Sequence, residues 1–305
     1  MEPPLEDDLG RYAVGDRVPP PYYFGVHPEG LDKAIFDDPF NTPAWIEHCE
    51  HVARRFGIER LRNLGDPESS SWKRLAANAF NYLRSPPIAA QMLASGIVSP
   101  IYLLPVAAMI RDTFLRKGKV SVLDVGGGFG ANYFGLLRGI HRDALRTLSY
   151  EVVDNERSCV LGRRLFSRYA VKPRFTSDHH ALQPAYDIVV IVGTLQYIAS
   201  WREALAGMAD RATLHLYVAR SPIGATTFST TQLICPAYGP RAGQNLGATR
   251  INVIGLEDLR QAMRRPSWQP TFEFMDADYS ARFARLPDPF NRAAHYCMGW
   301  SRSAG

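Results

Sequence analysis

The chain has 305 residues, of which 46% are hydrophobic and 21% charged, and its formal net charge is +5. This composition is typical of a globular protein, and no cluster of Lys and Arg with interleaved aromatic residues supports a nucleic-acid partner. The four cysteines, Cys49, Cys159, Cys235 and Cys297, lie far apart and form no C-x-x-C pair. This spacing argues against structural zinc and predicts buried thiols in a reducing compartment.

The chain begins with the acidic, proline-rich segment Met1-Glu-Pro-Pro-Leu-Glu-Asp-Asp, which lacks the basic and apolar regions of a signal peptide. The longest mainly apolar stretch, 97–110, contains two prolines and is too short to span a bilayer. We therefore expect a cytoplasmic protein with no membrane partner, and a homodimer is left open.

The first third of the chain is expected to be irregular up to residue 40 and mostly helical afterwards. Thr42 can cap a helix that has Pro43 at its first position and Gly57 at its end. Further helices are predicted after Ser71, after Pro87 and over 101–116. We expect residues 1–116 to form a lid segment followed by a helical extension.

From Val120 onward, strand and helix patterns alternate. The predicted strands cover 120–125, 148–153, 173–176, 187–192 and 213–219. The predicted helices cover 130–145, 156–168, 200–209 and 256–265. Ser200 and Glu203 fit a capping box, the polar residues 221–252 are expected to form a long loop, and strands at 271–275 and 294–300 are expected to pair antiparallel. The pattern predicts an α/β fold in residues 117–305, namely a Rossmann-like, doubly wound sheet of seven mostly parallel strands whose last strand is antiparallel.

A glycine-rich turn follows the first of these strands. It contains Asp124 and then Gly126, Gly127, Gly128 and Gly130, and glycine lets a ligand approach the bare backbone. The pattern also satisfies the G-x-G-x-x-G/A rule for dinucleotides. A carboxylate beside the turn would repel a pyrophosphate, whereas it favours the cationic end of S-adenosylmethionine (SAM). The turn therefore favours SAM over NAD(P).

Two further acids are candidate cofactor ligands. Asp154 ends the second strand, where an acid accepts hydrogen bonds from ribose hydroxyls, and Asn155 is expected to line the same site. Asp178 follows the third strand and is a candidate contact of the adenine amine. The neighbouring His179 and His180 have no accompanying ligand motif, so a solvated loop and no metal site is predicted there.

Ligands of open α/β sheets bind beyond the carboxyl ends of the strands, which places 193–197 at the transferable methyl group. Gly193, Thr194 and Leu195 are predicted to contact the cofactor, and Gln196 and Tyr197 the substrate. Thr230 and Gln232, after the fifth strand, are further predicted substrate contacts. His27, on an aromatic N-terminal segment, is the candidate general base, and Tyr197 is the second catalytic candidate.

The turn Val122-Leu-Asp-Val-Gly-Gly-Gly-Phe-Gly-Ala-Asn-Tyr-Phe134 resembles motif I of the class I SAM-dependent methyltransferases. Together with Tyr150-Glu-Val-Val-Asp154, Leu195-Gln-Tyr-Ile198 and Thr230-Thr-Gln232, it is similar to a family of bacterial methyltransferases of undefined substrate. The resemblance covers about residues 75–300. Many members of that family end the second strand in glutamate, whereas this chain has Asp154, and the similarity fades after Thr231.

These observations predict a SAM-dependent methyltransferase that acts on a small molecule, such as a natural-product or glycan-pathway intermediate. The transfer needs an in-line nucleophile more than acid–base help. Two alternatives stay open at this point: an NAD(P)-dependent oxidoreductase, and a partner protein that binds SAM without catalysing a reaction.

Overall fold

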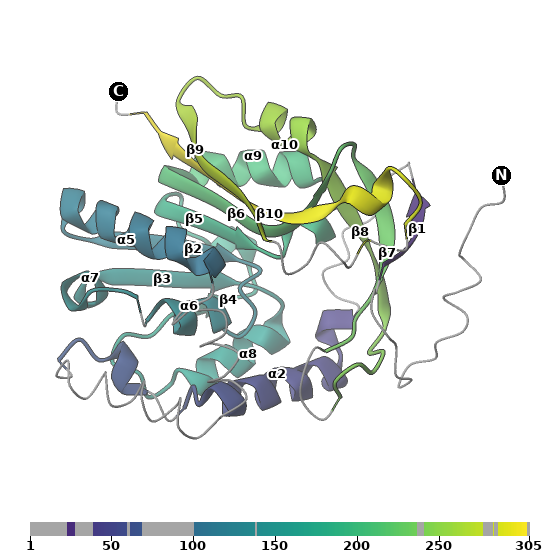
Figure 1. Ribbon diagram of the computed structural model, residues 1–305. Helices are drawn as coiled ribbons and strands as arrows, with labels where there is room; N and C mark the ends of the chain where they lie inside the picture. Colours follow the sequence, from purple (N-terminus) through teal and green to yellow (C-terminus); the bar gives the residue numbers. More distant parts are fainter. Residues whose placement is uncertain are drawn as a thin grey trace. The chain divides into compact units, whose positions relative to one another are not determined.

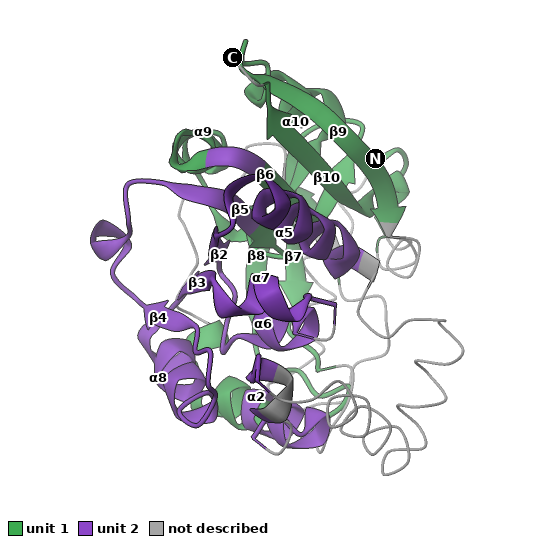
Figure 2. Ribbon diagram, turned by 90° about the vertical axis from the view of Figure 1, so that its left-hand side faces the viewer, with its two compact units in different colours: residues 1–48, 191–212, 216–305 green, residues 49–190, 213–215 purple. Residues whose placement is uncertain are grey.

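The computed structural model describes residues 23–27, 39–59, 62–68, 101–137, 139–236, 241–276, 283 and 286–303. The chain divides into two compact units, which Figure 2 draws in different colours. Unit 1 comprises residues 1–48, 191–212 and 216–305, and unit 2 comprises residues 49–190 and 213–215. The helices predicted after Ser71 and Pro87 lie outside the described residues.

Unit 2 contains the parallel strands that the sequence predicts. Strand β2 (Val120–Val125) pairs in parallel with β3 (Leu148–Val153), which pairs in parallel with β4 (Arg174–Thr176). Together with β5 (Tyr186–Val192), the order of these strands is β5-β2-β3-β4. Five of the six residues of β2 are buried, as expected for a strand that is covered on both faces.

The helices of unit 2 follow the sequence prediction with one exception. Helices α5 (Leu104–Lys117) and α8 (Glu156–Leu165) form at their predicted places. The single helix predicted over 130–145 is wrong, because the structure has two short helices there, α6 (Ala131–Leu136) and α7 (Arg142–Arg146). The break contains Gly139, a weak helix former, and α7 starts anew because the His141 ring accepts a hydrogen bond from the Asp143 N–H.

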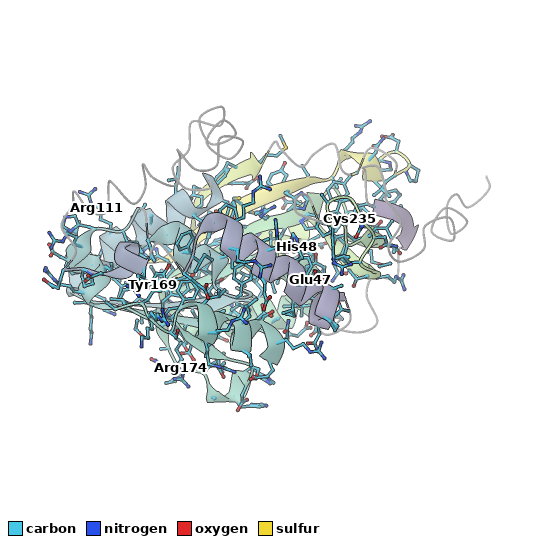
Figure 3. All side chains as sticks on the ribbon, turned by 90° about the horizontal axis from the view of Figure 1, so that it is seen from below. Glu47, His48, Arg111, Tyr169, Arg174 and Cys235 are labelled. Carbon is cyan, nitrogen blue, oxygen red and sulfur yellow. The ribbon has the colours of Figure 1, made fainter. Side chains whose placement is uncertain are left out.

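Helix α2 (Pro43–Phe56) confirms its predicted start and end. The Trp45 N–H donates to the Thr42 hydroxyl oxygen at 3.2 Å, and Gly57 ends the helix with a φ of 68°. Residues 43–48 of this helix belong to unit 1 and residues 49–56 to unit 2. Figure 3 labels Glu47 and His48 on the part of α2 in unit 1.

Unit 1 contains a β-structure where the sequence predicts a long loop. Strand β6 (Ala212–Gly224) runs beyond its predicted end, and β7 (Phe228–Leu233) and β8 (Ala248–Gly255) follow within the polar stretch. The N-terminal strand β1 (Tyr23–His27) pairs antiparallel with β7, beside which it runs in Figure 1. The strand order is β1-β7-β8-β6, and β7 and β8 are antiparallel. The prediction of one long loop over 221–252 is therefore wrong, because β6, β7 and β8 occupy 221–224, 228–233 and 248–252 of it.

The remaining elements of unit 1 lie near their predicted places. They are α9 (Trp201–Arg211), α10 (Leu256–Ala262), β9 (Trp268–Asp276) and β10 (Ala294–Arg302). Strands β9 and β10 pair antiparallel, as predicted, and β10 also pairs with β6. The capping box at Ser200 is wrong, since the Ser200 side chain makes no hydrogen bond to the start of α9.

A hydrophobic core cluster holds β1, β7 and β8 together. Its buried residues are Tyr23, Phe228, Ile251, Val253, Phe283, Leu286 and Ala293. The Tyr23 and Phe283 rings stack with their centroids 4.4 Å apart. Strand β1 is thus part of the core of unit 1, so the expectation of an irregular chain up to residue 40 is wrong for residues 23–27.

The predicted α/β fold with a large, mostly parallel sheet is confirmed, but the described residues contain ten strands instead of seven. The additional strands are β1, β7 and β8. Within the described ranges, no helix combines the length and apolar character needed to cross a membrane. None of the four cysteines forms a disulfide, and Cys235 is half-buried while the other three are buried.

Candidate active site

The glycine bend after β2 has the backbone that the sequence predicts. Gly126, Gly128 and Gly130 have φ values of 69°, 59° and 91°, in the left-handed region that glycine adopts without strain. The Gly126 N–H donates to the Val153 carbonyl at 2.8 Å, which ties the bend to the end of β3. Helix α6 begins directly after Gly130.

One side of this bend is packed and the other is open. A Cβ atom on Gly127 would lie 2.4 Å from the Asp124 carboxylate, and one on Gly130 would lie about 3 Å from the rings of Phe166 and Phe175. By contrast, among the described residues other than its two chain neighbours, no atom lies within 4 Å of the position that a Cβ on Gly128 would take. Gly128 therefore offers bare backbone to open space, as a ligand-binding bend requires.

Asp124 lies beneath the bend and has no exposed surface. The Tyr150 hydroxyl donates to its carboxylate at 2.8 Å, and the Asn132 amide donates to both carboxylate oxygens at 3.2 and 3.3 Å. Burial raises the pKa of the Asp124 carboxyl to about 7, although both hydrogen bonds lower it. The sequence predicts that the Asp124 carboxylate faces the cationic end of SAM. Because Asp124 is buried, it is not available for that direct contact.

An Asp124→Asn variant is expected to remove a pH dependence of stability. The pKa of about 7 in the folded protein exceeds the usual value of about 3.9 of an unfolded aspartate. The stabilising contribution of this carboxyl is therefore complete below about pH 4 and is lost as the pH rises through about 7. Between about pH 5 and pH 8, urea denaturation should show the wild type losing about 2 to 3 kcal/mol relative to the variant. If the difference in the free energy of unfolding between the wild type and the variant stayed constant over this pH range, the raised pKa of Asp124 would be contradicted.

Asp154 follows β3 and closes onto the glycine bend. The Gly128 N–H donates to one carboxylate oxygen at 2.8 Å, and the backbone and side-chain N–H groups of Asn155 donate to the other at 2.7 and 2.8 Å. The half-buried Asp154 is thus held beside the open backbone of Gly128. An anionic group already occupies this N–H of the bend.

The surroundings of Asp154 are mostly structural. Asn155 caps helix α8 by accepting from the Ser158 N–H at 3.0 Å. Burial raises the pKa of the Cys159 thiol to about 11, and the charge of Asp154 adds to this effect. The pKa of Cys49 is also raised, first by burial and then by Asp154. Both thiols stay protonated at neutral pH, so neither is a nucleophile here.

Asp178 is exposed and caps a short helical turn, because its carboxylate accepts from the His180 N–H at 2.8 Å. The rings of His179 and His180 are exposed, with centroids 4.0 Å apart. Across the part of the chain that the structure describes, no group of three His, Cys, Asp or Glu side chains could hold a metal ion. An adenine contact of Asp178 stays a prediction.

In unit 1, the chain turns sharply after β5. Gly193 has a φ of 65°, and a Cβ there would have no atom within 4 Å in the part of the chain that the structure describes, apart from its two chain neighbours. The Gly193 carbonyl accepts from the Gln196 side-chain amide at 2.9 Å, and the Thr194 carbonyl accepts from the Tyr197 N–H at 2.9 Å. Leu195 is fully buried. Of the three predicted cofactor contacts 193–195, Gly193 is the one that leaves open space where a Cβ atom would lie.

Tyr197 and Gln232 meet, although 35 residues separate them. The Tyr197 hydroxyl donates to the Gln232 side-chain oxygen at 2.9 Å. The Phe40 ring packs edge-on against Tyr197 at 4.9 Å, and the Trp45 ring packs against Phe40 at 5.1 Å. The structure therefore brings two predicted substrate contacts together and adds two aromatic residues that the sequence does not single out.

The other predicted substrate contacts lie in or beside β7. Thr230 is fully buried opposite Ile251 of β8, whereas Gln232 at the end of the same face is half-buried. The backbone of His27 lies opposite Ser229 of β7. The side chain of His27 lies outside the described side chains, so its role as a base stays a prediction.

Sequence reasoning missed several residues that shape these sites. They are Asn132 and Tyr150, which hold Asp124; Phe40 and Trp45, which pack near Tyr197; and Asn252, which donates to the Ile198 carbonyl. Tyr150 had a signal, since it lies on β3 four residues before Asp154, which follows that strand. The partners of Phe40 and Asn252 depend on contacts between distant segments.

No protein-family model and no curated protein matches the sequence. Among solved structures, the chain is similar to magnesium protoporphyrin IX methyltransferase from Synechocystis PCC 6803 with bound SAM. The identity is 13%, the match covers 89% of this chain and 100% of that one, and the TM-score is 0.43. The Burkholderia thailandensis 1,6-didemethyltoxoflavin-N1-methyltransferase is similar at 14% identity, 73% and 88% coverage and a TM-score of 0.43.

A third similar structure is the plantazolicin methyltransferase BpumL with bound S-adenosylhomocysteine, at 13% identity, 82% and 99% coverage and a TM-score of 0.41. Similarities at this level carry no argument about function, which rests on the geometry of the site. No family model supports the resemblance to a bacterial family of undefined substrate.

Proposed function

We propose that this protein transfers a methyl group from SAM to a small-molecule acceptor. The observation that carries the proposal is the 2.8 Å hydrogen bond from the Gly128 N–H to the Asp154 carboxylate. A dinucleotide site uses such N–H groups to bind a pyrophosphate. Here an aspartate takes that position, so the bend favours a nucleoside that has a ribose but no phosphate groups.

The residues of unit 2 fit the adenosine part of SAM. The open backbone at Gly128 leaves room for a ligand, and Asp154 beside it can accept from ribose hydroxyls. We propose that Asn155 and Asp178 border the same nucleoside. Asp124, Gly126, Gly127 and Gly130 shape the bend from within, and Asp124 acts through the loop rather than by touching the cofactor.

The turn after β5 has features that suit the reacting end of SAM. We propose that Gly193, Thr194 and Leu195 border the amino-acid part of the cofactor, with Gly193 presenting open backbone. SAM, when bound, supplies a methyl group on a sulfonium, which leaves as a neutral thioether. The protein then has to orient the acceptor and exclude water. Gln196, Tyr197, Thr230 and Gln232 are the proposed orienting residues.

The need for a base depends on the acceptor. A weakly acidic hydroxyl must lose its proton, whereas a free amine is already nucleophilic. We propose His27 as the base for the first case, since its strand lies directly beside β7. The Tyr197 hydroxyl keeps its proton and donates a hydrogen bond to Gln232, so we propose that Tyr197 orients the acceptor rather than abstracting a proton from it. We further propose that 117–305 carry the catalysis and that 1–116 extend it.

Calorimetry with SAM, S-adenosylhomocysteine and NAD(P) tests this proposal, with Asp154→Ala as the decisive variant. A hydrogen bond to a charged group contributes about 1.5–3 kcal/mol, so the variant should bind SAM roughly 10- to 150-fold more weakly. Asp143→Ala is a control, because it removes an exposed carboxylate from the same unit. Its SAM affinity should stay unchanged.

Binding of NAD(P) with no binding of SAM would overturn the proposal in favour of an oxidoreductase. Equal SAM affinity in the wild type and Asp154→Ala would contradict the ribose contact. SAM binding without transfer of a labelled methyl group to any acceptor would favour a non-catalytic SAM-binding partner.

A further inference from the structure

Half-buried aromatic rings gather around the Tyr197–Gln232 hydrogen bond in unit 1. The Phe40 ring packs edge-on against Tyr197 at 4.9 Å and against Trp45 at 5.1 Å, and each of the three rings keeps some exposed surface. We call these three residues and Gln232 the aromatic wall. Tyr197 lies four residues after the sharp turn at Gly193, where the reacting end of a bound nucleoside is proposed to lie.

The Gln232 amide has a defined orientation. Its Oε1 atom accepts from the Tyr197 hydroxyl at 2.9 Å, so its Nε2 group points away from that partner. None of the described residues accepts a hydrogen bond from this Nε2 group, although Gln232 is half-buried. A donor without a protein acceptor at a partly desolvated position favours a ligand that presents an acceptor atom.

The aromatic wall is also uncharged. The carboxylate of Glu47, next along the helix that carries Trp45, binds both Nε and Nη2 of Arg241 at 3.0 and 2.7 Å. Arg250, on the neighbouring β8, donates to the Ser229 hydroxyl at 3.3 Å. The His48 ring packs against Trp45 at 5.4 Å. The charges of Glu47 and Arg241 are thus paired with each other, and the four side chains of the aromatic wall itself carry no charge.

We propose that the methyl acceptor is a neutral, planar, conjugated ring compound whose carbonyl oxygen or unprotonated ring nitrogen accepts a hydrogen bond from Gln232 Nε2. The aromatic rings pack against the faces or edges of such a compound better than against an aliphatic one. This inference rests on the proposed function, because it names the substrate class of the same site.

Coumarin is a suitable probe, because it is neutral and planar and carries a carbonyl oxygen. Two relatives isolate the interactions: 2H-chromene lacks the carbonyl oxygen, and octahydrocoumarin lacks the aromatic ring. Ligand-observed NMR titrations in the presence of S-adenosylhomocysteine give the three affinities. The wild type should bind coumarin about fivefold more tightly than 2H-chromene, as expected for one net hydrogen bond. It should also prefer coumarin to octahydrocoumarin.

The decisive variant is Gln232→Glu, which keeps the acceptor for the Tyr197 hydroxyl but removes the Nε2 donor. It should lose about fivefold in coumarin affinity and nothing in 2H-chromene affinity. Gln261→Glu, on the exposed side of α10, adds the same charge to unit 1 and serves as the matched control. Phe40→Leu should weaken the binding of coumarin and 2H-chromene alike, because both lose ring packing.

Equal wild-type affinities for all three probes, or no saturable coumarin binding, would overturn the inference even if a variant failed to fold. So would an unchanged coumarin affinity in Gln232→Glu. SAM calorimetry on the same proteins distinguishes failure of the acceptor class from failure of the proposed function. If SAM binds normally but the protein shows no preference among the three probes, only the acceptor class is overturned. If the wild type does not bind SAM, the proposed function itself is overturned.

Discussion

A Gly128→Leu variant is expected to lose SAM affinity by roughly a hundredfold or more, which corresponds to about 2.7 kcal/mol. The backbone φ of Gly128 is 59°, and the space that a side chain would enter is open. A leucine therefore fits the folded protein, at a cost of about 1–2 kcal/mol for the left-handed conformation. The side chain would fill the space that the nucleoside needs. Calorimetry with SAM measures the loss.

Gly118→Leu is the matched control for this prediction. Gly118 has a φ of 67° and an equally open Cβ position, but it ends helix α5 before β2 and not in the glycine bend. Both variants should melt at similarly reduced temperatures, and only Gly128→Leu should fail to bind SAM. If both bind SAM like the wild type, the bend is not the cofactor site.

A Tyr23→Ala variant is expected to lower the free energy of unfolding by about 3–5 kcal/mol, the range of large-to-small changes at buried aromatic residues. Tyr23 is 1% exposed and stacks on the fully buried Phe283 at 4.4 Å. The loss leaves a cavity between β1 and the core of unit 1. Denaturant titration followed by circular dichroism measures the change.

Tyr296→Ala provides the comparison, because Tyr296 lies on β10 of the same unit but is half-buried. It should cost clearly less than Tyr23→Ala. A loss of below about 1 kcal/mol in Tyr23→Ala would mean that β1 adds little to the core, although buried aromatic residues usually contribute more.

The parallel strands and the glycine bend could be predicted because their signals are local. Strand β2 is an apolar run that ends in closely spaced glycines, and the structure gives positive φ values at Gly126, Gly128 and Gly130. The position of Asp154 follows from the parallel pairing of β2 and β3, which ends both strands at the same edge. Its hydrogen bond to the Gly128 N–H could not be foreseen, since it depends on the exact path of the bend.

The β-structure of residues 221–252 was missed because polarity was taken as a sign of a loop. Strand β7 is Phe-Ser-Thr-Thr-Gln-Leu, and threonine is a good strand former because it is β-branched. Pairing with β1 and β8 buries Ser229 and Thr230 completely. The signal was therefore present in the threonines, but the partner strands lie far away in the sequence.

The contact between Tyr197 and Gln232 shows the same limit in the candidate site. Both residues were predicted as substrate contacts from their places after strands, yet nothing local tells which atom of the amide faces the tyrosine. Phe40 lies in a short helical turn with no repeat or motif around it. Its packing on Tyr197 is a tertiary contact that no spacing rule predicts.

The stacking of Tyr23 on Phe283 also bears on biosynthesis. Tyr23 precedes its partners Phe228, Ile251 and Phe283 by more than two hundred residues in the chain. At a translation rate of about 5–20 residues per second, this delay lasts roughly ten to fifty seconds. The apolar side of β1 therefore stays without its native partners in the nascent chain during that time.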